Sequence, residues 1–187
     1  MMENLIKGYV NEVMALCAGL DGDGLSQVLK AFKDAYDANR RIFVAGNGGS
    51  AATANHFFCD FSKNAVRNNE KRAKIISLAS NVEAITAIGN DIGFDDIFVE
   101  QMKNLMEEGD LVLLISASGN SPDIVRAADY AKSKHGVIAG FTGFSGGKLK
   151  AMADISVHVA SESYEQIEDI HLMLTHIIVC YFKSLNL

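Results

Sequence analysis

Short apolar runs alternate with amphipathic stretches along the chain from residue 41 to its end. Each apolar run fits a buried strand, and the stretches between them repeat their apolar positions at helical spacing. The predicted strands lie at residues 41–45, 73–78, 110–116, 137–142 and 155–159, and the predicted helices at 50–64, 81–88, 94–105, 122–133, 147–152 and 164–184. This alternation predicts a doubly wound α/β domain, in which helices cover both faces of a five-stranded parallel sheet.

The first forty residues carry two helical patterns and no predicted strand. Apolar side chains recur at helical spacing over residues 2–20 and again over residues 24–38. The apolar stripe of the first helix fits packing against another subunit or against its own domain, and the sequence leaves both open. No linker, repeat or low-complexity tract divides the chain, so residues 1–187 are predicted to form a single domain.

Composition narrows the class of protein and its surroundings. Hydrophobic residues make up 49% and charged residues 21% of the 187 residues, as in globular proteins. The net charge of −6 and the lack of a basic run predict no nucleic-acid partner. No apolar stretch is long enough to span a membrane. Three cysteines without C-x-x-C spacing fit buried, reduced thiols, and no signal-peptide pattern opens the chain, so a cytoplasmic protein is expected.

A glycine-rich turn joins the first predicted strand to a helix. Gly46, Gly48 and Gly49 allow a tight turn, and Ser50 is a suitable N-cap for the helix that follows. Such a strand–turn–helix unit points backbone N–H groups and the positive end of a helix dipole at one spot, which suits an anion such as phosphate. The loop is neither a dinucleotide-binding nor a Walker motif. Taken alone, it fits a structural turn equally well.

A second loop of the same kind follows the strand at 110–116. It carries Ser116, Ser118, Asn120 and Ser121, and Pro122 then occupies the first helical position behind Ser121 as N-cap. These side chains and the backbone can surround phosphate oxygens without a lysine. Ligands of open α/β sheets bind at the carboxyl edge, where both loops fall. A phosphorylated small molecule is therefore the predicted ligand, although Ser121 could simply cap its helix.

Both loops together resemble the sugar isomerase (SIS) domain family. The segments 87–94, 141–147 and 167–176 narrow the resemblance to the phosphoheptose isomerases, which convert sedoheptulose 7-phosphate to D-glycero-D-manno-heptose 7-phosphate. The resemblance covers nearly the whole chain and implies a homotetramer with active sites at subunit interfaces. It places the phosphate-binding serines at Ser50, Ser116, Ser118 and Ser121. The predicted substrate-binding set also includes Asn47, Gly48, Gly49, Asn90, Asp91, Asn120 and Glu168, of which Asp91 could instead stabilise its turn.

Four side chains on two helices are the candidates for chemistry. His56 and Asp60 are four residues apart and share one helix face, whereas Glu168 and His176 lie about 12 Å apart along the last helix. In the family that this chain resembles, Asp60 is usually glutamate, the catalytic base, and Glu168 is usually glutamine. Asp60 is the predicted base and His176 the predicted acid of an enediolate mechanism.

Two imidazoles and two carboxylates also fit a divalent metal. Some members of the family bind zinc at the matching positions, so the predicted ligands are His56, Asp60, Glu168 and His176, with zinc as the expected ion. A tight ligand cannot also serve fully as a free base, and the sequence leaves that conflict open. His171, on the same helix as His176, is expected to pack or hydrogen-bond structurally.

Two other functions remain open on the sequence alone. One is an isomerase that acts on another sugar phosphate, because the fold and the phosphate loops would be the same. The other is a non-catalytic SIS protein of the type that binds a replication initiator. The carboxylate–histidine set favours an enzyme, whereas the aspartate at position 60 keeps the binding protein open.

Overall fold

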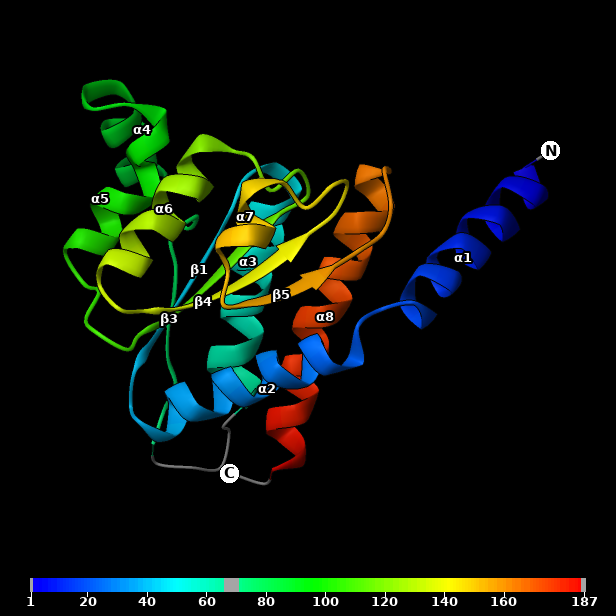
Figure 1. Ribbon diagram of the computed structural model, residues 1–187, viewed down its shortest axis with the longest axis horizontal. Coiled ribbons are helices and arrows are strands. Elements are labelled where there is room, and N and C mark those ends of the chain that lie inside the picture. Colours follow the sequence, from blue (N-terminus) through cyan, green and yellow to red (C-terminus); the bar gives the residue numbers. More distant parts are fainter. Residues whose placement is uncertain (1, 66–70, 186–187) are drawn as a thin grey trace.

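The computed structural model describes residues 2–65 and 71–185. Its five strands form one parallel sheet in the order β2-β1-β3-β4-β5, as Figure 1 shows. The strands are β1 (Arg41–Gly46), β2 (Lys74–Ser77), β3 (Leu111–Ser116), β4 (Val137–Thr142) and β5 (Ile155–His158). β3, in the centre, is buried along its whole length because helices cover both faces of the sheet. The predicted α/β fold is confirmed.

Two helical layers sandwich this sheet. One apolar cluster joins it to α2 (Gly22–Asp37), α3 (Gly48–Asp60) and α8 (Tyr164–Ser184). The other joins its opposite face mainly to α5 (Ile97–Lys103), α6 (Pro122–Ser133) and α7 (Gly147–Met152). The remaining helical segments are α1 (Met2–Ala18), α4 (Val82–Asp91), a π-helical turn at Phe61–Ala65 and a 3₁₀ turn at Phe94–Asp96.

Several predicted boundaries differ from the structure by a few residues, and three of the differences have a physical reason. α3 begins two residues before Ser50, and its N-cap is Asn47 rather than Ser50, because Gly46 lets the first helical turn lie directly against the end of β1. α4 continues through Gly89 to Asp91, since one helical glycine costs only about 1 kcal/mol and does not end a helix. The helix predicted at 94–105 is a 3₁₀ turn followed by α5.

α1 extends away from the sheet at one side of the molecule (Figure 1). None of its residues is buried, and Met2, Leu5 and Met14 are each more than 60% exposed. Polar contacts connect it to α8: Tyr9 donates to Asp169 at 2.6 Å, and Glu12 accepts from Gln166 at 2.6 Å. The bond to Asp169 raises the pKa of Tyr9 to about 12. Val13, Leu16 and Cys17 pack against the core, whereas the apolar side chains at Met2, Leu5 and Met14 are not covered by their own chain.

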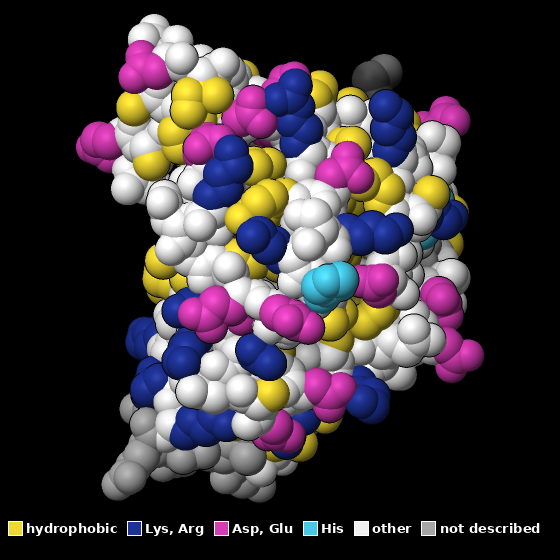
Figure 2. Space-filling model, turned by 60° about the vertical axis from the view of Figure 1, so that its left-hand side comes forward, with side chains coloured by type: hydrophobic (Ala, Val, Ile, Leu, Met, Phe, Trp, Pro, Cys, Tyr) yellow, Lys and Arg dark blue, Asp and Glu magenta, His cyan; other side chains and the backbone are white. Residues whose placement is uncertain are grey.

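Figure 2 shows basic and acidic side chains interspersed over one face, with hydrophobic side chains among those on the part that projects at the upper left. Val82, the first residue of α4, and Phe94, which follows the end of α4, are among the exposed apolar side chains. Among the described helices, none is long and apolar enough to cross a membrane. Cys59 and Cys180 are exposed, so the expectation of buried thiols is wrong for these two. Neither belongs to a C-x-x-C motif or to the core, so nothing in the structure requires their thiols to be buried.

Candidate active site

The two loops of interest leave neighbouring strands at the carboxyl edge of the sheet. β1 pairs with β3, with Gly46 opposite Ile115. After β1 the chain enters α3 on one face of the sheet, and after β3 it enters α6 on the other face. The loops therefore diverge from adjacent strand ends and leave a crevice between them, which is the topological switch point of this strand order.

A polar hollow lies in this crevice. The predicted site residues that line it come from both loops and from α8: they are Asn47, Ser50, Ser116, Ser118, Ser121 and Glu168. Ile115, Ala117 and Tyr164 complete its wall. Neither lysine nor arginine is among these lining residues, so the backbone, the hydroxyl groups and the two helix dipoles are what the hollow offers an anion.

Two of the helices that begin at the hollow, α3 and α6, have N-cap residues whose side chains make no cap bond. Asn47 and Ser121 occupy the N-cap positions of α3 and α6, and neither side chain bonds a backbone N–H of its helix. Asp21 and Asn81 do cap α2 and α4, which begin elsewhere, and Ser163 caps α8, which begins at the hollow with Tyr164. The first N–H groups of a helix need an external partner. In α6, Pro122 has no N–H, and the N–H groups of Asp123 and Ile124 bond the Asp123 carboxylate. The first N–H groups of α3 have no side-chain partner among the described residues, so these donors remain open to a ligand.

Hydrogen bonds within the second loop hold its serines in place. Gly119 has φ +64°, and a Cβ there would collide with the carbonyl oxygen of Gly146, so glycine is required. The Gly119 N–H donates to Ser116 Oγ at 3.1 Å. Asn120 donates to the Ser118 carbonyl oxygen at 3.2 Å and accepts from the Lys148 N–H at 3.1 Å. Asn120 braces the loop and lies outside the lining of the hollow, so its contact with substrate stays a prediction.

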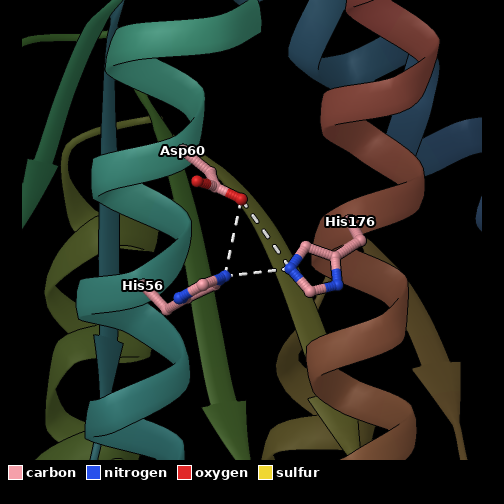
Figure 3. Close-up of side chains that lie close together, drawn as sticks. All are labelled: His56, Asp60 and His176. Atoms are coloured by element: carbon pink, nitrogen blue, oxygen red, sulfur yellow. Dashed lines mark hydrogen bonds and ion pairs between the residues drawn. The ribbon is translucent and has the colours of Figure 1, made fainter.

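His56, Asp60 and His176 converge between α3 and α8 (Figure 3). Oδ2 of Asp60 lies 3.4 Å from Nε2 of His56 and 3.7 Å from Nε2 of His176. The two Nε2 atoms are 2.9 Å apart, so one imidazole donates to the other. All three side chains keep access to solvent. The structure thus brings together three of the four predicted metal ligands, including the predicted base and acid.

This donor set fits a divalent metal. Zinc at 2.0–2.1 Å from each of three tetrahedral ligands would separate their atoms by about 3.3 Å. The observed separations of 2.9, 3.4 and 3.7 Å lie on both sides of that value. Imidazole nitrogen and carboxylate oxygen are usual zinc ligands. The group could therefore bind a metal with small side-chain adjustments.

Glu168 lies apart from this group and next to Gly49. A Cβ at Gly49 would lie 2.5 Å from Oε1 of Glu168, so the carboxylate packs directly on the backbone of the first loop. Glu168 lines the polar hollow and also a second hollow that continues along α3 to His56, past Thr53. In the described chain it is not part of the three-residue metal group, and its role as a metal ligand stays a prediction. The eight residues to His176 span about 12 Å of helix.

Asn90 and Asp91 lie outside both hollows. They occupy the exposed last turn of α4, not the turn that was predicted, and Asn90 donates to Asp91 at 2.7 Å. Neither residue lines the hollows of the described chain. Their contact with a substrate therefore stays a prediction.

His171 has the structural role expected of it. Its side chain is fully buried, and Nε2 donates to the carbonyl oxygen of Thr142 at 3.3 Å. Burial lowers the pKa of His171 to about 4. The imidazole is thus neutral near pH 7 and faces the sheet, whereas His176 faces α3.

Several residues at the hollows are missing from the predicted set. Tyr164 opens α8 beside the serines, and Thr53 and Asp169 line the second hollow. Asp123 is 2% exposed and accepts from Asn47 at 2.8 Å. An acidic residue in the first turn of a helix ordinarily indicates only a dipole interaction, so Asp123 carried no signal of a site. The periodicity of α3 could have indicated Thr53, which shares a face with His56.

The comparisons with known proteins agree with this geometry. The family model for the SIS domain matches residues 8–143. A phosphoheptose isomerase from Helicobacter pylori is 32% identical over 181 residues, which are 95% of this chain and 94% of the relative. One from Escherichia fergusonii is 33% identical over 186 residues, with 96% and 95% covered.

The solved structure of the phosphoheptose isomerase from Neisseria gonorrhoeae superimposes with a TM-score of 0.90 at 27% identity, and 98% of this chain and 100% of that chain are covered. Fold and crevice define an α/β protein of the SIS class. Within that class, the chain belongs to the phosphoheptose isomerase family.

Proposed function

We propose that this protein interconverts sedoheptulose 7-phosphate and D-glycero-D-manno-heptose 7-phosphate. The observation that carries the proposal is the placement of an anion-binding hollow and a carboxylate–histidine group along the same helix, α3. Six residues, or about 9 Å of helix, separate Ser50 from His56. Seven bonds separate C1 of an extended heptose 7-phosphate from its phosphate-bearing oxygen, and they also span about 9 Å at carbon–carbon bond lengths.

The phosphate would occupy the polar hollow. The start of α3, whose first N–H groups no side chain caps, lies beside it, and the hydroxyl-bearing residues Ser50, Ser116, Ser118 and Ser121 line it. A phosphate at a helix N-terminus gains from both the free donors and the dipole. Glu168, the one charged residue of the lining, faces the sugar because it also borders the second hollow.

Asp60 and His176 would carry out the proton transfers. Asp60 removes the proton from the carbon beside the carbonyl, which gives an enediolate, and returns it to the neighbouring carbon. His176 moves a proton between the two oxygens, so that a ketose and an aldose interconvert without net gain or loss of atoms. Oδ2 of Asp60 and Nε2 of His176 are 3.7 Å apart and can reach adjacent carbon and oxygen atoms of one substrate.

His56, Asp60 and His176 would hold a zinc ion in this proposal. Three protein ligands with access to solvent leave a coordination position open, which is typical of catalytic rather than structural zinc. A bound zinc would polarise the substrate oxygens and stabilise negative charge on them. With zinc bound, one carboxylate oxygen of Asp60 would help to hold the metal, and the other would remain available for proton transfer.

We also propose a homotetramer in which the exposed stripe of α1 packs on another copy. Met2, Leu5 and Met14 are exposed on that stripe, which favours the first of the two packing possibilities that the sequence left open, a partner subunit. α1 contacts Asp169 and Gln166, which flank Glu168 in α8. Assembly through α1 would therefore place subunit contacts beside the hollows.

The test is turnover of sedoheptulose 7-phosphate by the wild-type protein, followed by NMR of the aldose product. The Asp60→Asn variant should lose turnover by at least about 100-fold, the lower range for loss of a positioned base. Its affinity for inorganic phosphate should stay within twofold of wild type, because Asp60 lies about 15 Å of helix from Ser50. No turnover by the wild type would contradict the proposed function. Full turnover by Asp60→Asn would contradict the role of Asp60 as base.

A further inference from the structure

Asp123 is a buried carboxylate next to the polar hollow that the proposed mechanism does not use. It is the second residue of α6, and its side chain is 2% exposed. Burial raises the pKa of Asp123, while hydrogen bonds from Asn47 and from the backbone N–H groups of Ile124 and Asp123 itself oppose that rise. Burying a carboxylate is unfavourable unless donors surround it. This carboxyl group has three donors, one of which comes from the other loop.

That donor connects the two loops of the hollow. The side-chain nitrogen of Asn47, at the start of α3, donates to Oδ2 of Asp123 at 2.8 Å. The two residues are 76 positions apart in sequence, and each stands at the beginning of one of the two uncapped helices. Asn47 is a favoured N-cap residue, yet its side chain bonds Asp123 and leaves its own helix uncapped.

The bond decides which end of the Asn47 amide the hollow receives. A carboxylate only accepts hydrogen bonds, so the amide must turn its NH₂ group toward Asp123. The amide oxygen then has no donor among the described residues, and Asn47 lines the hollow. An oxygen acceptor does not suit a phosphate oxygen, which is itself an acceptor, whereas a hydroxyl group can donate to it.

We propose that Asp123 is a positioning residue that fixes the Asn47 amide so that its oxygen accepts a hydrogen bond from a hydroxyl group of the bound sugar phosphate. The inference rests on the proposed function and refines it. In this proposal Asn47 binds the sugar, and the serines and the N-terminus of α3 bind the phosphate. In the Asp123→Asn variant the amide at position 123 can donate as well as accept, so Asn47 is no longer held in one orientation.

The experiment compares the affinity for sedoheptulose 7-phosphate with that for inorganic phosphate, both by calorimetry. Asp123→Asn should weaken the sugar phosphate by about three- to tenfold, the range expected for one neutral hydrogen bond. Affinity for inorganic phosphate should stay within twofold. Asn47→Ala should give the same selective loss, and Asp123→Asn should add nothing in the Asn47→Ala background, which a merely structural role of Asp123 would not produce.

Other results would overturn the inference. Equal weakening of both ligands would mean that Asp123 supports the phosphate site as a whole. A further loss from Asp123→Asn in the Asn47→Ala background would mean that it does not act through Asn47. If Asp123→Asn does not fold, Asn47→Ala alone decides, because it removes the proposed acceptor and leaves Asp123 its backbone donors.

Turnover separates this inference from the proposed function. A wild-type protein that binds the sugar phosphate but does not isomerise it would contradict the proposed function, while a selective loss on Asp123→Asn would still support the role of Asp123. A wild-type protein that binds the sugar phosphate no more tightly than inorganic phosphate would overturn both.

Discussion

Gly49 and Glu168 offer a direct test of how closely the site is built. In Gly49→Ala the new methyl group would lie 2.5 Å from Oε1 of Glu168 and closer still to the rest of its carboxylate. Favourable contacts of a carbon atom begin beyond 3 Å, so the carboxylate must move by about 1 Å. A displacement of about 1 Å can cost a rate factor of about 100. We expect kcat/KM for sedoheptulose 7-phosphate to fall by about this factor, or about 2.7 kcal/mol of barrier.

The substitution should leave the fold intact. Gly49 lies in the first turn of α3 and is not among the residues with positive φ, so its backbone conformation accepts alanine. Alanine favours a helix over glycine by up to about 1 kcal/mol. The unfolding free energy from urea denaturation should therefore equal or exceed that of the wild type, which separates a loss of activity from a loss of stability.

A double-mutant cycle isolates the clash. In a Glu168→Ala background the carboxylate is absent, so Gly49→Ala should change kcat/KM by less than about twofold, within the error expected for uncoupled sites. Both backgrounds are compared in the NMR turnover assay. An equal loss from Gly49→Ala with and without Glu168 would refute the reasoning, because it would show that the methyl group interferes with ligand binding by itself.

Three further predictions concern the metal, the buried histidine and the first helix. Calorimetry should show one zinc ion per chain. His56→Ala should weaken zinc binding by more than the roughly 10- to 100-fold that follows loss of an outer-shell partner, whereas His135→Asn, at an exposed position, should not. Equal zinc affinities of wild type and His56→Ala would argue against the site. The depressed pKa of His171 means that the unfolded chain takes up a proton below about pH 6.5 while the folded one does so only near pH 4. The unfolding free energy should therefore fall by up to about 3 kcal/mol more from pH 6.5 to 4 in the wild type than in His171→Phe, with His135→Asn keeping the wild-type slope; parallel curves would contradict this. Leu5→Asp, which places a charge on the exposed stripe of α1, should reduce the mass measured by light scattering below that of a tetramer, whereas Lys7→Ala on the same helix should not. A tetramer formed by the Leu5→Asp variant would exclude this surface from the interface.

The fold was predictable because its strands are short, apolar and separated by clear helical patterns. Buried parallel strands such as β3 have no polar face, so composition alone identifies them. The sequence misplaced boundaries where a residue has two common uses. Gly89 suggested a helix end and lies within α4, and Ser50 suggested an N-cap and lies inside α3. Tertiary packing decides such cases, and local propensity does not.

The site was predictable only as far as one helix or one loop determines it. His56 and Asp60 share a face of α3 by spacing alone. That His176 joins them, and that Glu168 does not, depends on how α8 crosses α3, which no local pattern contains. The side-chain bond between Asn47 and Asp123 joins residues 76 positions apart and could not be inferred from either loop.

The two N-cap positions at the hollow explain why the sequence left a structural turn equally possible. Asn47 and Ser121 are residue types that ordinarily cap helices, so their presence alone indicates only a helix start. In the structure, the Asn47 amide bonds Asp123, so the first N–H groups of α3 keep no side-chain partner among the described residues. Ser121 makes no cap bond either, but the Asp123 carboxylate accepts from the first N–H groups of α6, those of Asp123 and Ile124. Because buried donors without partners are unfavourable, a helix start of this kind is maintained where solvent or a ligand supplies the missing acceptors. At α3, the anion-binding capacity of the hollow therefore comes from the hydrogen bonds that Asn47 does not make within its own helix.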